Sequence, residues 1–168
     1  MVDENKVQEI IDKVEIHELM SKYELMYDRF DETAIEAHVD EFMRLFTDDC
    51  VVDYGDHGKI DGKDALREFQ LKYFDRETDF QDWFHIIANP WIEVDGEQAR
   101  GRFNFFGPYV MNGVGACWQF SFYDIDFEKV SNAWKIGHLR LEVKYMTPYE
   151  EGWESVPIDE TFTTGDSL

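Results

Sequence analysis

QARGRFNFFGPYVMNGVGACWQFSFYDIDF, residues 98–127, has the length and composition of two long strands joined by a hairpin. We predict one strand from Gln98 to about Val110 and a second from Gly115 to Phe127. Gly113 and Gly115 fall at the ends of these strands, where a hairpin needs glycine geometry. The segment therefore predicts the centre of an antiparallel sheet.

Two more strands flank this hairpin. The first covers residues 83–94 and ends at Asp95-Gly96, a dipeptide typical of tight hairpin turns. The last covers residues 133–146 and is ended by Pro148. Together the strands predict a four-stranded meander over residues 83–146.

The residues before the meander are mainly helical in pattern. Apolar residues recur at helical spacing over 6–30 (Val7, Ile10, Ile11, Val14, Ile16, Leu19, Met20, Tyr23, Tyr27, Phe30), which predicts one long helix. Further helices are predicted over 33–46 and 64–74. Between them, 50–54 suits a short strand and 59–62 a brief extended segment, whereas 75–82 is predicted to be a loop.

Helices that precede strands favour an α+β fold over an alternating α/β fold. The 168 residues suit a single domain, which we place at 1–150, with a polar tail at 151–168. If the sheet curves, its concave face and the three helices enclose a pocket. A hydrophobic small molecule is the partner that such a pocket predicts.

The charge balance excludes several classes of partner. Thirty-seven Asp and Glu face sixteen Lys and Arg, a formal net charge of −21 that repels nucleic acid and anionic membranes. The N-terminus carries no signal-like apolar core, and no run is apolar enough for a membrane span, so we expect a cytoplasmic protein. Cys50 and Cys117 lie in apolar surroundings and suit buried free thiols.

His85 is the strongest candidate for chemistry. It is flanked by Phe84, Ile86 and Ile87, and an imidazole in such surroundings beside a carboxylate serves as a general base near neutral pH. A satisfied histidine in the core is the competing interpretation. Asn89 would share its strand face unless a bulge intervenes, and would then bind a substrate oxygen.

Tyr23 and Asp28 lie five positions apart near the end of the first predicted helix. Asp28 suits either a pocket carboxylate or a solvated cap, and Tyr23 either the pocket or the core. On the last strand His138, Arg140, Glu142 and Lys144 share one face, which suits solvent, a subunit interface or a polar pocket wall. No metal-ligand spacing and no phosphate-binding glycine loop stand out in the sequence, so we expect neither metal nor cofactor.

Several segments resemble the SnoaL-like family of the nuclear transport factor 2-like superfamily. The matching pieces, spread over roughly residues 8–150, are Tyr23 with Asp28, residues 45–55, residues 62–66, His85 with Asn89, residues 94–99, residues 134–136 and residues 145–148. The resemblance implies a cone-shaped curved sheet wrapped by three N-terminal helices around one deep pocket, the cystatin-like α+β roll. Within the family, the residues look like those of scytalone dehydratase and bile acid 7α-dehydratase.

The resemblance also implies roles. Asp28 and His85 would form a dyad that abstracts a proton, and Tyr23 would orient substrate or polarise an oxygen. We expect six further residues to bind substrate: Asn89, Tyr54, Phe103, Trp118, His138 and Arg140. The family commonly forms dimers or trimers, and exposed Trp91, Trp153 and Phe162 are compatible with that.

One position departs from the pattern. Val143, nine residues after Trp134, stands where the bile acid enzyme has an arginine, so the resemblance assigns no basic residue to the leaving group at this position. The leading hypothesis is a cofactor-independent lyase, a dehydratase of hydrophobic cyclic substrates. An isomerase or polyketide cyclase with the same pocket is an alternative, and so is a non-catalytic module that binds a small ligand or resembles an oxygenase beta subunit.

Overall fold

The computed structural model describes residues 3–55 and 58–151. Its helices are α1 (Glu4–Asp28), α2 (Ile35–Phe42), the 3₁₀ turn η1 (Met43–Leu45) and α3 (Lys63–Phe74). Its strands are β1 (Phe46–Asp53), β2 (Lys59–Asp61), β3 (Phe80–Trp83), β4 (Ile86–Asp95), β5 (Gln98–Met111), β6 (Gly115–Val130) and β7 (Ala133–Pro148). The helices precede the large strands, as the sequence predicts.

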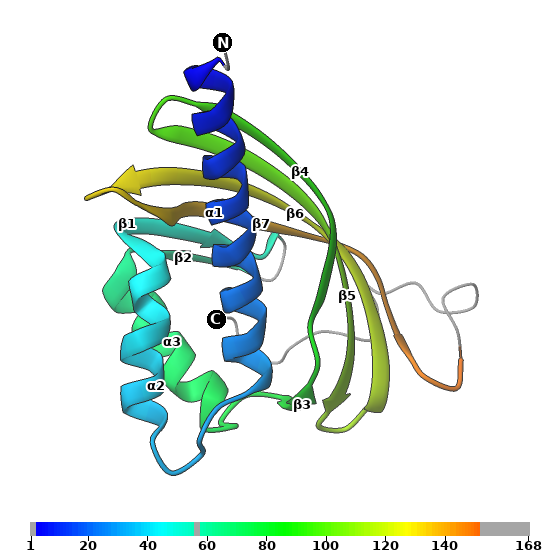
Figure 1. The fold of residues 1–168 in the computed structure, drawn as a ribbon. Helices are drawn as coiled ribbons and strands as arrows, with labels where there is room; N and C mark the ends of the chain where they lie inside the picture. The colour runs from blue at the N-terminus through cyan, green and yellow to red at the C-terminus, as the bar shows by residue number, and fades with distance from the viewer. Residues whose placement is uncertain (1–2, 56–57, 152–168) are drawn as a thin grey trace.

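The seven strands form one strongly curled sheet. Its order is β2-β1-β7-β6-β5-β3, and β4 also pairs with β5. Figure 1 shows α1 running across the concave side of the sheet, with α2 and α3 beside it. The predicted α+β roll is confirmed, with one addition to the predicted antiparallel sheet: β1 runs parallel to β7, so the sheet is mixed.

Some predicted boundaries are wrong. The helix predicted over 33–46 ends at Phe42, and after η1 the buried Phe46 already begins β1, which was predicted only from residue 50. The predicted loop 75–82 contains the start of β3 at Phe80. The strand predicted over 83–94 is divided, because the chain leaves β3 after Trp83 and enters β4 at Ile86.

Register shifts help to curl the sheet. They occur between Ala88 and Trp91 of β4, and at two places where β6 pairs with β7. Such bulges bend a strand and increase its twist. Gly107 of β5 contributes differently, because a Cβ there would lie 2.8 Å from the Phe105 ring and 2.9 Å from the Tyr109 ring. Its missing side chain lets these two rings close over the backbone.

A buried polar contact fastens the first half of α1 to the sheet. Asp12 accepts hydrogen bonds from the Lys129 ammonium (2.5 Å), the Trp134 indole (3.0 Å) and the Gln8 amide (3.3 Å). The predicted apolar positions around it differ in burial. Ile16 is fully buried, whereas Val7, Ile10, Ile11 and Val14 are exposed.

The two cysteines are free and buried, as the sequence predicts. Within the described residues no helix has the length and apolar character required to cross a membrane. Trp153, Phe162 and the tail beyond residue 151 lie outside the described residues.

Candidate active site

The site is built around a buried contact between His85 and Asp28. The imidazole Nδ1 lies 2.8 Å from the Asp28 Oδ1, and the two side chains are only 5% and 8% exposed. The backbone N–H of His85 also donates to both carboxylate oxygens of Asp28, at 3.0 Å each. One carboxylate therefore fixes both the ring and the backbone of His85.

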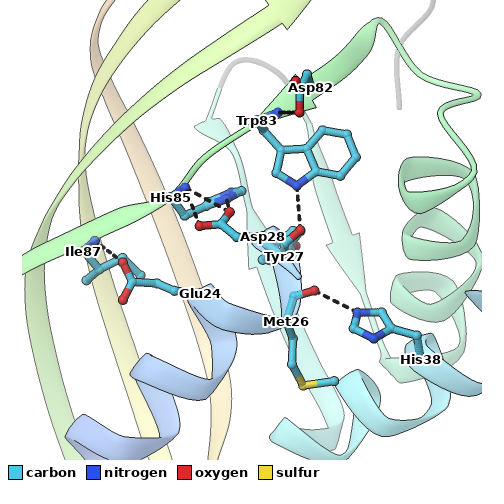
Figure 2. A network of polar contacts seen from close by, with 9 residues as sticks. All are labelled: Glu24, Met26, Tyr27, Asp28, His38, Asp82, Trp83, His85 and Ile87. Atoms are coloured by element: carbon cyan, nitrogen blue, oxygen red, sulfur yellow. Dashed lines mark hydrogen bonds and ion pairs between the residues drawn. The ribbon is translucent and has the colours of Figure 1, made fainter. Parts of the chain in front are cut away.

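The end of α1 places Asp28 at this point. Asp28 is the last residue of the helix, and the carbonyl groups just before it would lack partners within the helix. The Trp83 indole donates to the Tyr27 carbonyl (2.8 Å), and the His38 imidazole lies 2.8 Å from the Met26 carbonyl. Figure 2 shows how these contacts, from β3 and α2, surround the last turn of α1.

The Asp28 contact decides which nitrogen of His85 is available. A carboxylate accepts hydrogen bonds, so Nδ1 carries the proton of the neutral ring and Nε2 keeps its lone pair. The Tyr27 ring stacks on the imidazole at 4.7 Å, and Phe105 lies 5.4 Å away. These apolar faces hold the ring in one orientation, the arrangement that a general base requires.

His85 lines a cavity of about 760 Å³ between the helices and the concave face of the sheet. Its buried and half-buried walls are aromatic and aliphatic, with Phe69, Phe80, Tyr73, Tyr109, Ile60, Met111, Leu141, Val143 and Met146. Apart from Ala65, the exposed lining residues are charged: Lys59, Asp61, Glu68, Lys72, Glu77 and Asp79. The cavity therefore has an apolar interior and a predominantly acidic rim.

Tyrosine hydroxyls provide polar groups in the interior, and the six tyrosines that line it include Tyr23, Tyr27, Tyr54 and Tyr123. Burial raises the pKa of Tyr27, although hydrogen bonding with Tyr23, Gln70 and Tyr54 opposes the shift; the Gln70 amide donates to its hydroxyl at 2.7 Å. Burial also raises the pKa of Tyr23 and of Tyr54 well above the ordinary phenol value. These phenols are therefore neutral hydrogen-bond donors around pH 7, not bases.

A second polar group lies on β6. The Gln119 amide lines the cavity and donates to the hydroxyl of Ser121 at 2.8 Å, and both residues are buried. In the sheet register Ser121 pairs with Val143. At the position where the family resemblance leads us to look for an arginine, the cavity wall therefore carries the aliphatic Val143 next to the Ser121 hydroxyl.

The structure brings together part of the predicted site. Tyr23, Tyr54 and His85 line the cavity, and Asp28 contacts His85. Phe103 is buried, but it packs against Phe127 and does not line the cavity. The site also contains Tyr27, Tyr123 and Gln119, which the sequence analysis did not select.

Four other predicted substrate-binding residues lie outside the cavity lining. Asn89 is exposed, because it has a positive φ of 54° at the register shift of β4, and the expected alternation stops there. Trp118 lies on the outer face and stacks on Phe106 at 5.2 Å. His138 and Arg140 also point outward: His138 Nδ1 lies 3.8 Å from an Asp126 oxygen, and Arg140 is exposed.

Across residues 3–55 and 58–151, His, Cys, Asp and Glu do not gather in groups of three that could hold a metal ion. The polar groups of the cavity interior are one imidazole, phenols and the Gln119 amide. This set suits proton transfer and the binding of a neutral oxygen.

Solved structures share the fold. A putative scytalone dehydratase from Novosphingobium aromaticivorans has a TM-score of 0.69 and 22% identity, with 89% of this chain and 95% of that chain covered. A hexachlorocyclohexane dehydrochlorinase from Novosphingobium barchaimii has a TM-score of 0.72 and 16% identity, with 90% and 99% covered. At these identities the likeness shows a common fold.

Sequence comparison shows the family. An uncharacterized protein of Mycobacterium tuberculosis (strain ATCC 25618 / H37Rv) is 30% identical over 141 residues, which cover 82% of this chain and 88% of that protein. The family model of the SnoaL-like domain matches residues 8–140. The chain therefore belongs to the SnoaL-like family.

Proposed function

We propose that the protein is a cofactor-independent lyase, a dehydratase that acts on a hydrophobic cyclic substrate. The observation that carries this proposal is the buried His85–Asp28 contact at the wall of a largely apolar cavity. A core histidine would be enclosed on all sides, whereas His85 adjoins empty space large enough for a ring-containing ligand.

In the proposed reaction the Nε2 of His85 takes a proton from the carbon next to a substrate carbonyl. Asp28 stabilises the imidazolium that forms, and neutral phenols, Tyr23 foremost, donate hydrogen bonds to the enolate oxygen. The enolate then re-forms its carbonyl and expels the β-hydroxyl group, which takes the proton from the imidazolium and leaves as water. The proton count closes without any further acid.

The rim of the cavity narrows the substrate class. It carries Asp61, Glu68, Glu77 and Asp79, and its two lysines already pair with carboxylates, Lys59 with Asp61 and Lys72 with Glu68. The rim therefore has a net negative charge and disfavours anionic ligands. A neutral polycyclic or aromatic ketone suits both this rim and the apolar interior.

An isomerase or cyclase remains the second candidate, and Val143 is the observation that favours it. No cationic side chain of β7 lines the cavity, so this strand provides no charged group for a departing anion. In an isomerase the same imidazole would return the proton to another carbon of the substrate. A module that only binds its ligand is the third candidate.

Incubation in D₂O with a panel of neutral cyclic β-hydroxyketones separates these candidates. A dehydratase forms a conjugated enone and releases water, which absorbance and mass spectrometry detect. An isomerase incorporates deuterium without losing mass as water, and a binding module perturbs ligand NMR signals but leaves the ligand unchanged. Failure to convert any bound ketone would contradict both catalytic proposals.

We also propose that the chain forms a homo-oligomer through the outer face of its sheet. Ile86, Phe106, Phe120 and Tyr145 pair in register across β4, β5, β6 and β7, and we call these four residues the outer row. Three of them are 41–50% exposed. Two rows further along the same face, Arg102 pairs with Asp124 at 2.9 Å. A face that carries both apolar side chains and charges of both signs complements a second copy of itself.

Phe120→Glu should convert the oligomer to a 20.0 kDa monomer, because it places a carboxylate in the centre of the outer row. The thermal midpoint of the monomer should change little, since Phe120 is 41% exposed. Light scattering coupled to gel filtration measures the mass. Val130→Glu, at an equally exposed site at the end of β6, is the matched control and should leave the mass unchanged.

A further inference from the structure

One edge of β4 faces α1 instead of another strand. Phe84 N–H donates to the Pro108 carbonyl of β5 at 3.1 Å, and β4 then pairs with β5 from Ile86 onward. Because backbone N–H groups alternate in direction along an antiparallel strand, those of His85 and Ile87 point away from β5. An unpaired strand edge of this kind requires other acceptors.

Two carboxylates of α1 provide these acceptors. Asp28 accepts the N–H of His85, and Glu24, one helical turn earlier, accepts the N–H of Ile87. Figure 2 shows both side chains reaching from α1 to the same strand. The series of outward N–H groups ends soon afterwards, because the register shifts after Ala88 and Pro90 has no N–H.

Glu24 is an unusual glutamate for a helix on the surface. It is partly buried, and burial raises its pKa most, with a further upward contribution from Asp28 and an opposing one from the Ile87 hydrogen bond. Among the described residues no Lys or Arg forms an ion pair with it. It accepts a hydrogen bond from the Ile87 N–H of β4, so its position favours a structural role at this strand.

We propose that Glu24 is a positioning residue for the His85–Asp28 pair, an inference that rests on the proposed function. Asp28 holds both the ring and the backbone of His85, so the ring geometry depends on where the start of β4 lies against α1. Glu24 fixes that strand two residues further on. Two attachments prevent the strand from rotating about the Asp28 contact, which a single attachment would allow.

The test compares Glu24→Leu, which removes the acceptor, with Glu24→Gln, whose amide oxygen still accepts from Ile87. Glu18, exposed on the same helix, provides the matched control Glu18→Leu. Two readouts need no substrate: hydrogen exchange at the amides of His85 and Ile87, and the tautomer of His85 in long-range ¹⁵N–¹H spectra. A general loss of stability would accelerate exchange throughout the core, so core amides serve as the internal reference.

In Glu24→Leu we expect the amides of His85 and Ile87 to exchange about tenfold faster than in the parent, relative to the core amides. This is the effect of losing one charge-assisted hydrogen bond. We also expect the ring to populate both tautomers. Glu24→Gln and Glu18→Leu should keep the parent pattern. If the leucine variant does not fold, Glu24→Ala removes the same acceptor and is judged by the same readouts.

Parent-like exchange and a single tautomer in the variants without an acceptor would overturn the proposal. So would a glutamine variant that behaves like the leucine variant, because the acceptor would then not be sufficient. These outcomes are independent of the reaction: a protein without lyase activity still reports the geometry of His85. Conversely, loss of turnover in a His85 variant says nothing about Glu24, so the two failures are distinguishable.

Discussion

His85→Ala should lower kcat for the proposed elimination by about 10²–10⁴-fold, the usual contribution of a positioned general base. The affinity for substrate should remain within a few-fold of that of the parent, because most of the cavity wall is provided by other side chains. The measurement is steady-state turnover of a ketone identified in the panel, together with calorimetric binding of its unreactive deoxy analogue.

His17→Ala is the matched control, since His17 is exposed on α1 and is not among the residues that line the cavity. His85→Gln serves as a second variant, because it fills more of the buried space than alanine and cannot act as a base. Full turnover in both His85 variants would contradict the assignment of His85 as the base of either reaction.

The fold could be predicted from the sequence because its signals are local. Asp95-Gly96 specifies a hairpin, and helical spacing specifies most of α1. The parallel pairing of β1 with β7 joins segments about 85 residues apart, and nothing local in either segment specifies its neighbour. The division at Phe84–His85 was missed for a related reason: α1, a distant element, supplies the acceptors that this strand edge needs.

Some residues of the candidate site also have a local sequence signal, and others do not. Tyr27 could have been found, because it lies four residues after Tyr23 and therefore on the same helix face. Tyr123 and Gln119 carry no comparable signal, because only the curl of the sheet turns their side of β6 toward α1. Asn89 was expected on the His85 face unless a bulge intervened, and the structure has such a register shift between Ala88 and Trp91, which the sequence marks only with Pro90.

Stability should depend most strongly on Asp12. Asp12→Ala leaves the Lys129 ammonium, whose side chain is 12% exposed, and the buried Trp134 indole without their main acceptor. Breaking a buried pair of this kind costs about 3 kcal/mol. For a domain of this size that corresponds to a fall in Tm of roughly 6–12 °C, measurable by calorimetry.

Asp12→Ala should also change how the stability of the protein depends on pH in the acidic range. Burial alone would raise the pKa of Asp12, but hydrogen bonds from Lys129, Trp134 and Gln8 hold it below the ordinary carboxyl value. The contribution of Asp12 to the free energy of unfolding is therefore complete above the ordinary carboxyl pKa of about 4. It is lost as the pH falls through the lower pKa that Asp12 has in the folded protein. The difference in stability between the parent and Asp12→Ala should shrink in that window.

Asp12→Asn separates the charge from the hydrogen bonds. Its amide oxygen still accepts from the Trp134 indole, so the asparagine variant should lose less stability than the alanine variant. We expect its free energy of unfolding to fall by about 1–2 kcal/mol, a loss that reflects the unneutralised Lys129 ammonium. Glu15 cannot replace the charge fully, because its carboxylate lies 3.6 Å from the ammonium and is 44% exposed. An asparagine variant as unstable as the alanine variant would show that charge neutralisation alone holds α1 to β6 and β7. A variant as stable as the parent would assign that attachment to the hydrogen bonds.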